Sequence, residues 1–231
     1  MNAAVALAKV EFSWPGGGFR LSLDSLTIAR GERVFLSGES GSGKSTLLAL
    51  IAGILTPKTG VVSVDGTDLA ALKGPARDRF RAERIGVIFQ MFNLLSYAPP
   101  LDNILLPLAF APERRRRVER PEAEARRLAA ELGLDADVVG ARRSSDLSIG
   151  QQQRIAAARA LIGGPSLVIA DEPTSALDAT AQAAFLDLLM SQAEAAGATL
   201  LMVSHDDRMA ARFDRQIALA DIARVERSAA A

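Results

Sequence analysis

The chain has 231 residues, of which 49% are hydrophobic, so it is long and apolar enough to bury a sizeable core and is not expected to be disordered. Lys plus Arg equals Asp plus Glu at 27 each, and this balance predicts no specific nucleic-acid partner, although local patches remain possible. The lack of cysteine excludes disulfides and thiolate metal sites, and no apolar run reaches the ~18 residues that span a bilayer.

The N-terminal segment is predicted to form an antiparallel hairpin. Residues 9–14 alternate and are rich in strand formers, residues 15–18 (PGGG) form a turn, and residues 19–28 give the returning strand. Residues 1–10 are apolar but lack the basic segment and the long apolar stretch of a signal peptide. We therefore interpret them as the lead-in to the first strand.

Strands then alternate with helices along the chain. The prolines between residues 91 and 112 exclude one continuous helix there. Alternation of this kind predicts an α/β protein with a mostly parallel sheet covered on both faces, into which residues 91–162 insert as a helical lobe. The predicted strands are 34–37, 59–69, 84–90, 166–171 and 198–206, and the predicted helices are 44–55, 121–132, 148–162 and 179–197.

A glycine-rich loop joins the strand at 34–37 to the helix that begins at Lys44. Residues 38–45 fit G-x-x-x-x-G-K-[ST], in which glycines let the backbone wrap a phosphate that a Cβ would keep away. The helix start favours anions, Lys44 can reach the β- and γ-phosphates, and the Ser45 hydroxyl can ligate Mg²⁺. The alternative, a glycine-rich turn with an incidental lysine, fits this strand–loop–helix context poorly. The predicted nucleotide-binding residues of the loop are Gly38, Glu39, Ser40, Gly41, Ser42, Gly43, Lys44, Ser45 and Thr46.

Two adjacent carboxylates follow the apolar strand at 166–171. Asp171 at the strand end can hold Mg²⁺ beside Ser45, and Glu172 can orient or deprotonate a water that attacks the γ-phosphate. The alternative is a solvated pair that opens a turn before Pro173. A carboxylate placed to activate water favours hydrolysis over transfer to a bound acceptor.

Residues 147–154 (LSIGQQQR) begin a helix, with Ser148 as N-cap and Gln151 as its capping-box partner. Such a helix start can serve as a cap alone, or also as an anion site. With this segment the chain resembles the nucleotide-binding subunits of ATP-binding cassette (ABC) transporters over nearly its whole length. Six motifs occur in the family's order: residues 38–45, Gln90 at a strand end, residues 147–154, Asp171–Glu172, residues 175–178 (SALD) and His205.

The resemblance implies a single nucleotide-binding domain over residues 1–231. It would be a P-loop NTPase core, residues 1–90 and 163–231, with an N-terminal antiparallel β subdomain and an inserted helical subdomain over residues 91–162.

The resemblance also implies a homodimer that sandwiches two molecules of ATP with Mg²⁺. The signature of one copy would face the γ-phosphate held by the other, through Ser148, Gly150 and Gln151, and Asp178 would act across the interface. The alternative role of Asp178 is a helix N-cap.

Further site residues follow from the same resemblance. Gln90 would contact Mg²⁺ and the attacking water, and His205 would contact the γ-phosphate. Trp14 matches the position where the family stacks an aromatic ring on adenine, with a core tryptophan as the alternative. The implied catalytic residues are Glu172, His205, Gln90 and Lys44, and the implied metal-site residues are Ser45, Gln90 and Asp171.

One position departs from the family, because Ile149 stands where glycine is usual. Isoleucine adds a branched side chain at the helix start but keeps its N–H. We therefore expect ATP-driven dimer closure to survive.

Residues 89–108 and the QQQR of the signature resemble the subgroup that serves lipoprotein-release, macrolide-efflux and cell-division permeases. The apolar, proline-broken segment 91–107 is predicted to be a docking surface for a membrane partner, with ordinary core of the lobe as the alternative. Residues 113–120 (ERRRRVER) are interpreted as a solvated helix face, with attraction to anionic lipid as the alternative.

The sequence therefore predicts the ATPase subunit of an ABC transporter, peripheral on the cytoplasmic face of the inner (plasma) membrane and bound to integral membrane permease subunits. The alternatives are a soluble ABC ATPase that works on DNA or ribosomes, a small-molecule kinase and a non-hydrolysing regulatory module. The cargo is chosen by the permease and cannot be read from this chain.

Overall fold

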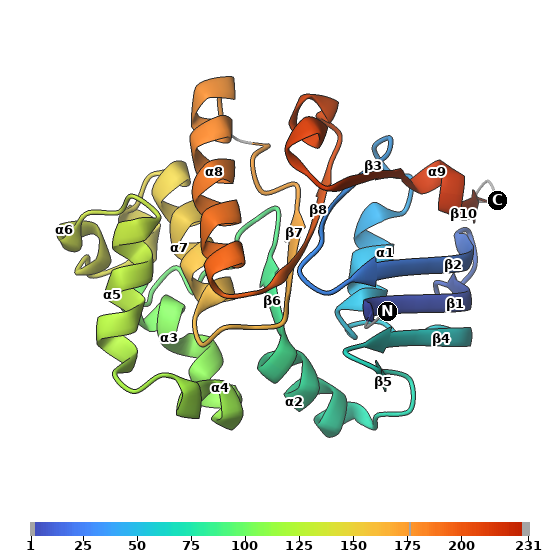
Figure 1. Cartoon of the computed structure of the whole chain (residues 1–231), viewed down its shortest axis with the longest axis horizontal. Helices are drawn as coiled ribbons and strands as arrows, with labels where there is room; N and C mark the ends of the chain where they lie inside the picture. The colour runs from blue at the N-terminus through green and yellow to red at the C-terminus, as the bar shows by residue number, and fades with distance from the viewer. Residues whose placement is uncertain (1–2, 176, 228–231) are drawn as a thin grey trace. The chain divides into compact units, whose positions relative to one another are not determined.

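The structure, a computed structural model, describes residues 3–175 and 177–227, and it divides into two compact units (Figure 1). Unit 1 comprises residues 1–81 and 201–231, and unit 2 comprises residues 82–200. The boundaries fall inside a helix, α2 (Gly74–Arg84), and a strand, β8 (Thr199–Ser204).

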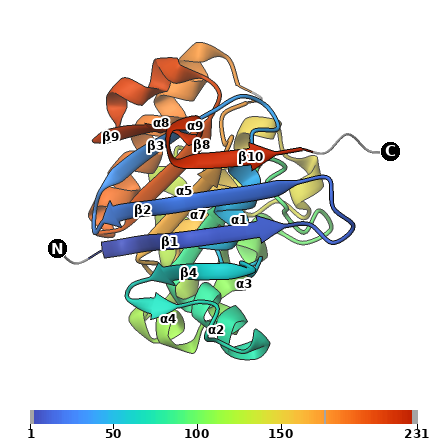
Figure 2. The ribbon, with the colours of Figure 1, turned by 90° about the vertical axis from the view of Figure 1, so that its right-hand side faces the viewer.

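Unit 1 contains an antiparallel sheet with the strand order β10-β2-β1-β4-β5 (Figure 2). The pairing of β1 with β2 places Leu7 opposite Leu26 and Val10 opposite Leu23, and all four side chains are buried. The hairpin predicted at the N-terminus is therefore confirmed. The strands of this sheet are β1 (Ala3–Ser13), β2 (Arg20–Ala29), β4 (Thr59–Val64), β5 (Thr67–Asp68) and β10 (Ala223–Glu226).

Unit 1 also contains parallel strands, in which β3 (Arg33–Ser37) lies between β8 and β9 (Arg215–Ala218). The β3 strand is apolar and buried, as expected for a strand covered on both faces. Three shorter elements complete the unit: α1 (Lys44–Ile51), the 3₁₀ helix η2 (Asp207–Arg212) and α9 (Leu219–Ile222).

Unit 2 combines the parallel pair of β6 (Ile85–Ile88) and β7 (Leu167–Asp171) with helices. The helix that follows the signature, α7, packs against β6, α3 and α5. The buried residues of α7 include four alanines, at 156–158 and 160, and β6 has a glycine at 86, so the backbones of α7 and β6 approach closely. The helices are α3 (Pro100–Phe110), α4 (Pro112–Arg117), α5 (Pro121–Glu131), α6 (Ala136–Val139), the 3₁₀ helix η1 (Ser144–Asp146), α7 (Ile149–Leu161) and α8 (Ala179–Ala195).

Local signals account for the helices that the sequence predicted. Helix α5 begins with Pro121 at its first position and ends before Gly133, whose φ of 74° is in the left-handed region. The α/β class with a parallel and an antiparallel sheet is confirmed. The boundaries of the helical subdomain, residues 91–162, stay a prediction.

Some elements differ from the expectation. Strand β6 ends at Ile88, so Gln90 lies beyond the strand end. The segment with many prolines contains a helix of 11 residues, α3, with Pro107 inside it. Helix α2 was not predicted, because its sequence (GPARDRFRAER) is too polar to show an apolar period.

The interpretation of residues 113–120 as a solvated face is wrong at Arg114, which is 1% exposed. The Arg114 guanidinium donates through Nε to the Ile162 carbonyl at 3.0 Å and through Nη2 to the Ala160 carbonyl at 3.1 Å. These carbonyls belong to the C-terminal end of α7, whose last carbonyls need donors from outside the helix. Burial lowers the pKa of Arg114 to about 10, an effect that the charge of Arg117 adds to.

The start of α4 is held by a buried carboxylate. Glu83 is 4% exposed and accepts hydrogen bonds from the backbone N–H groups of Glu113 and Arg114, at 2.9 and 2.8 Å. A carboxylate at a helix start satisfies N–H groups that have no partner within the helix. Helix α4 is therefore held in two ways: Glu83 binds the N–H groups at its start, and the Arg114 side chain binds the carbonyls at the end of α7.

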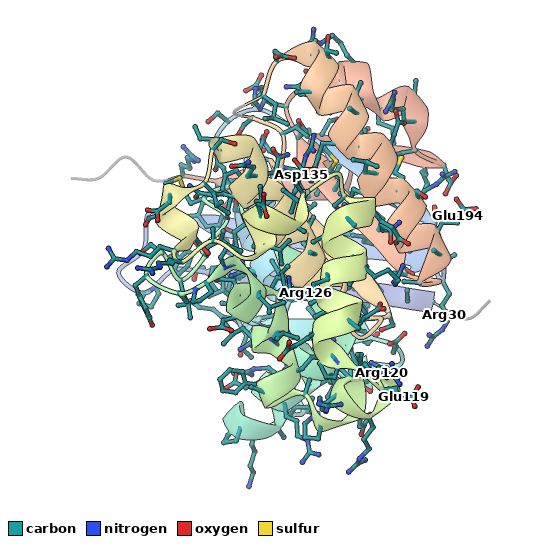
Figure 3. All side chains as sticks on the ribbon, turned by 90° about the vertical axis from the view of Figure 1, so that its left-hand side faces the viewer. Arg30, Glu119, Arg120, Arg126, Asp135 and Glu194 are labelled. Atoms are coloured by element: carbon teal, nitrogen blue, oxygen red, sulfur yellow. The ribbon has the colours of Figure 1, made fainter. Side chains whose placement is uncertain are left out.

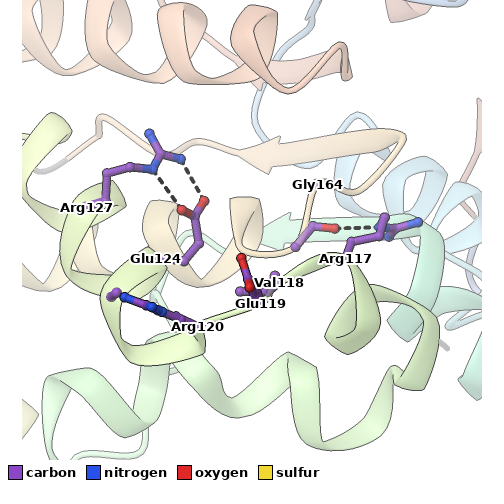
Figure 4. Close-up of a pocket in the computed structure, with 9 residues that line it drawn as sticks. Arg117, Val118, Glu119, Arg120, Glu124, Arg127 and Gly164 are labelled. Atoms are coloured by element: carbon purple, nitrogen blue, oxygen red, sulfur yellow. Dashed lines mark hydrogen bonds and ion pairs between the residues drawn. The ribbon is translucent and has the colours of Figure 1, made fainter.

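The other arginines of the segment are exposed, and Figure 3 shows Arg120 at the surface next to Glu119. Arg117 lines a hollow of about 480 Å³ and donates to the Gly163 carbonyl at 3.0 Å (Figure 4). Arg127 lines the same hollow and binds the Glu124 carboxylate at 2.6 Å. These arginines are thus engaged by groups of the chain itself.

We predict that Gly86→Ala destabilises the protein by about 3 kcal/mol. A Cβ at this β6 position would lie 2.2 Å from the Ala160 carbonyl oxygen, and neither backbone can yield cheaply. Urea unfolding measures the change. Gly74→Ala, where an added Cβ meets nothing within 4 Å, is the control and should shift stability by no more than about 1 kcal/mol. Equal stability of the two variants would contradict the close packing of α7 on β6.

Candidate nucleotide-binding site

The phosphate loop runs from the end of β3 to the start of α1. Gly41 and Gly43 have φ of 76° and 103°, in the region that favours glycine, and a Cβ on Gly38 would lie 2.9 Å from Ser42 Oγ. Helix α1 has no side-chain cap and no acidic residue in its first turn. Its first N–H groups are therefore available to an anion, as the sequence pattern predicted.

Lys44 lies against its own loop. Its side chain is 7% exposed, and Nζ donates to the carbonyl oxygens of Gly38 at 2.5 Å and Glu39 at 2.8 Å. These two carbonyl oxygens hold the ammonium group against the loop. The hydroxyl of Ser42 is buried and has no hydrogen-bond partner among the described residues, so the loop also offers an unused polar group.

A hollow of about 490 Å³ extends from this loop. Trp14 lines it and is 44% exposed, with its ring edge-on to Phe12 at a centroid distance of 5.1 Å. The alternative of a core tryptophan is thus wrong. The residues that line the hollow are Trp14, Gly18, Phe19, Gly41, Gly43, Lys44, Ser45, Thr46 and Arg227. Unit 1 therefore brings the aromatic residue and the phosphate loop together, and adds Arg227, which was not predicted.

The predicted acidic residues lie in unit 2, at the end of β7. Asp171 is the last residue of the strand, and Glu172 is 9% exposed with a φ of 47°. A left-handed conformation in a non-glycine residue costs about 1 kcal/mol or more and persists where the surroundings enforce it. The alternative of a solvated pair does not fit Glu172.

The segment that follows Glu172 is held by two glutamines. Gln153 of α7 donates to the Pro173 carbonyl at 2.5 Å, and Gln182 of α8 donates to the Thr174 carbonyl at 3.1 Å. Asp178 caps α8 by accepting from the Ala181 N–H at 2.9 Å. The cap role is therefore present, and the role of Asp178 across a dimer interface stays a prediction. Ala176 of the SALD segment lies outside the described residues.

The signature forms the capping box that the sequence predicted. Ser148 Oγ accepts from the Gln151 N–H at 3.3 Å, and Gln151 Oε1 accepts from the Ser148 N–H at 2.9 Å. Ile149, the first residue of α7, is 55% exposed. Its side chain takes no part in the cap, so the departure from glycine leaves this helix start intact.

Gln90 is exposed, and the loop that follows it is tied to α7 by Arg159. Phe92 and Asn93 have φ of 57° and 49°, and the Arg159 guanidinium donates to both of their carbonyls, at 2.7 Å for Asn93. Arg159 is 8% exposed, and burial lowers its pKa. Helix α7 therefore carries the signature at its start and holds the loop after Gln90 near its end, a link that the sequence analysis missed.

His205 follows the last residue of β8 in unit 1 and is exposed. Its neighbour Asp206 binds Arg208 at 2.6 Å, and this hydrogen bond lowers the pKa of Asp206. The contact between His205 and the γ-phosphate stays a prediction.

An α/β protein whose glycine-rich loop joins a buried parallel strand to a helix with an uncapped start is a P-loop nucleotide-binding protein. A sequence model of the ABC transporter family matches residues 21–175, and the chain belongs to this family.

Relatives along most of the chain agree with this assignment. The chain is 39% identical to the lipoprotein-releasing system ATP-binding protein LolD of Syntrophotalea carbinolica, over 87% of this chain and 86% of that protein. It is 45% identical to LolD of Anaeromyxobacter dehalogenans, over 85% and 80%. It is also 42% identical to the macrolide export ATP-binding/permease protein MacB of Bradyrhizobium diazoefficiens, over 85% of this chain and 29% of that protein.

A solved structure matches the whole fold. The ATP-binding cassette MJ0796, in a dimeric post-hydrolysis state bound to ADP and Pi, aligns with a TM-score of 0.82 and 31% identity, over 98% of this chain and 100% of that chain. The predicted function class, an ATP-binding and ATP-hydrolysing subunit of an ABC transporter, is confirmed, as is the resemblance to the lipoprotein-release and macrolide-efflux subgroup. None of the helices in the part of the chain that the structure describes is long and apolar enough to cross a membrane.

We predict that Arg159→Met frees the loop after Gln90. The variant leaves the two loop carbonyls without their donor, which should cost about 2 kcal/mol of stability, and amide hydrogen exchange in residues 91–95 should become faster. Arg154→Met is the control, because the Arg154 guanidinium of the same helix makes an exposed bond to the Gly133 carbonyl at 2.8 Å. Unchanged exchange of residues 91–95 in Arg159→Met would rule out the tie.

Proposed function

We propose that two copies of this chain clasp two molecules of MgATP and that ATP hydrolysis drives a separate membrane permease. The observation that carries the proposal is the phosphate loop, with left-handed Gly41 and Gly43 before the uncapped start of α1. It is supported by the relatives, which are ATP-binding proteins of lipoprotein release and macrolide export, and by the dimeric state of MJ0796.

The residues that line the hollow in unit 1 are proposed to bind the nucleotide. The Trp14 ring would stack on the adenine, since stacking needs only an exposed π-face. The N–H groups at the start of α1 would bind the phosphates, and Lys44 would leave the carbonyls of Gly38 and Glu39 for the β- and γ-phosphates. His205 would contact the γ-phosphate.

Ser45, Gln90 and Asp171 would hold the metal ion. They offer a hydroxyl, an amide and a carboxylate oxygen, which are the hard oxygen donors that Mg²⁺ takes, together with phosphate oxygens and water. When bound, Mg²⁺ neutralises charge on the β- and γ-phosphates. The donor set of the chain fits this ion.

Glu172 would position the attacking water and accept its proton. Its side chain is nearly buried and its backbone is held in the left-handed region, so the carboxylate has a fixed direction. Phosphoryl transfer relies mostly on such positioning and on charge neutralisation. The site is therefore suited to hydrolysis.

The signature would complete the partner's site. Ser148 and Gly150 lie at the start of α7, where the helix dipole favours an anion. Gln151 holds the Ser148 N–H, so its proposed contribution is to shape this helix start.

The proposal extends to the permease that this chain drives. By similarity to LolD and MacB, the partner would be an integral membrane permease for lipoprotein release or macrolide efflux, with this chain at the cytoplasmic face of the inner membrane. In the segment 91–107 the exposed apolar side chains are Met91 and Tyr97, whereas Phe92 is buried. Docking is therefore proposed at residues 91 and 97.

We predict that Glu172→Gln retains ATP and traps the closed dimer. Without the carboxylate the attacking water is not activated, so turnover should fall at least about 100-fold while MgATP still drives dimerisation, measured by light scattering. Glu194→Gln, at an exposed position of α8, is the control for the charge change (Figure 3). Near-normal turnover in Glu172→Gln, or a strictly monomeric protein at saturating MgATP, would overturn the proposal.

We predict that Met91→Glu and Tyr97→Glu release the chain from its permease without weakening ATP binding. The two side chains are 82% and 74% exposed, so a charge there should leave the fold intact and disfavour an apolar interface. Co-purification from native membranes measures the loss. Phe110→Glu, at a side chain that is 66% exposed at the end of α3, is the control and should keep the permease bound. Full retention of the permease by both test variants would count against docking there.

A further inference from the structure

The C-terminal strand of unit 1 passes over the phosphate loop. Strand β10 pairs with β2 (Figure 2). Side chains alternate along it, so that Ala223 is buried and Arg224 is exposed. A Cβ on Gly43 would lie 3.3 Å from Val225 Cγ2, so Val225 faces the loop. Arg227, two residues further along, is on the same side as Val225.

The Arg227 side chain reaches the loop itself. Its Nη2 donates to the Gly41 carbonyl, and a Cβ on Gly41 would lie 2.7 Å from Nη2. Two features favour glycine at position 41: its φ of 76°, and the space beside it that the Arg227 guanidinium occupies.

Arg227 also borders the nucleotide hollow. It lines this hollow together with Trp14 and with Lys44, Ser45 and Thr46, and it lines a second hollow over the loop residues Gly38 to Ser42. A guanidinium has five N–H donors, and among the described residues the one hydrogen bond of Arg227 goes to a neutral carbonyl. Its positive charge is therefore not cancelled by that partner.

We propose that Arg227 is a second cationic ligand of the nucleotide, besides Lys44, and contacts a phosphate group that ADP and ATP share. The proposal rests on the proposed function, because it takes ATP as the occupant of the hollow. The placement follows from two observations: Arg227 donates to the Gly41 carbonyl of the phosphate loop, and it lines the same hollow as Lys44, Ser45 and Thr46 at the start of α1, where the phosphates are accepted. The affinity for both ADP and ATP should therefore depend on Arg227.

The alternative is that Arg227 only latches the C-terminal strand to the loop through the Gly41 carbonyl. The two roles differ in what they require of the side chain. A latch needs a donor of sufficient length, which a glutamine can supply, whereas a phosphate ligand needs the positive charge, which a lysine retains.

The test is calorimetric titration of the full-length chain with unlabelled MgADP and MgATP, because a label would add contacts of its own in the hollow. Arg227→Ala should weaken both nucleotides about tenfold, as the loss of one charge-assisted hydrogen bond at an exposed site predicts. Arg227→Gln should weaken them as much, and Arg227→Lys should retain most of the affinity. Arg224→Ala, on the opposite face of β10, is the charge-matched control and should bind as the unaltered chain does.

The outcomes separate this inference from the function on which it rests. If the unaltered chain binds neither nucleotide, the proposed function fails. If the unaltered chain binds and Arg227→Ala binds equally well, or Arg227→Gln retains full affinity, the phosphate contact is wrong. Thermal unfolding without nucleotide checks that each variant is folded, and a loss in Arg224→Ala equal to that in Arg227→Ala would show a general charge effect and overturn the proposal.

Discussion

The arrangement of this chain depends on cations that are held by backbone carbonyl oxygens. Lys44 donates to carbonyls of the phosphate loop, Arg159 to carbonyls of the loop after Gln90, and Arg114 to carbonyls at the end of α7. Burying a guanidinium is unfavourable unless its donors are satisfied, and each of these loops presents carbonyls that no regular ladder uses. The position of each cation and the path of the backbone that binds it therefore depend on each other. Removing the cation leaves acceptors without donors, and moving the loop leaves a buried charge without acceptors.

A neutral partner matters most where a phosphate is to be bound. If a carboxylate held the cation, its charge would oppose an incoming anion, and the ion pair would have to break before the phosphate could take its place. A carbonyl positions the cation and leaves its charge to act on the phosphate. Arg227 is placed in this way beside the hollow, through the Gly41 carbonyl. Arg208, which is paired with Asp206, shows the contrasting case of a cation whose charge is already balanced.

The sequence predicted those elements whose signals are local. The capping box at Ser148, the proline and glycine that bound α5 and the glycine spacing of the phosphate loop each fix a conformation from neighbouring residues. The contacts of Arg114, Arg159 and Arg227 could not be predicted, because their partners are backbone carbonyls 32 to 186 residues away along the chain. Every residue has a carbonyl, so such a partner leaves no mark in the sequence. The arginines at 114–117 were therefore all interpreted as solvated, although Arg114 is buried.

The two residues after the N-cap of α7 bear directly on the proposed dimer. Among the described residues, a Cβ on Gly150 would meet only Leu177 Cδ2, at 3.9 Å, and Gly150 has no left-handed backbone, so an alanine would fit there. Ile149 projects an exposed side chain and still offers its N–H to whatever lies beyond the helix start. In the proposed dimer, a phosphate held by the second copy would approach this helix start. Bulk would then be excluded at 150 and tolerated at 149.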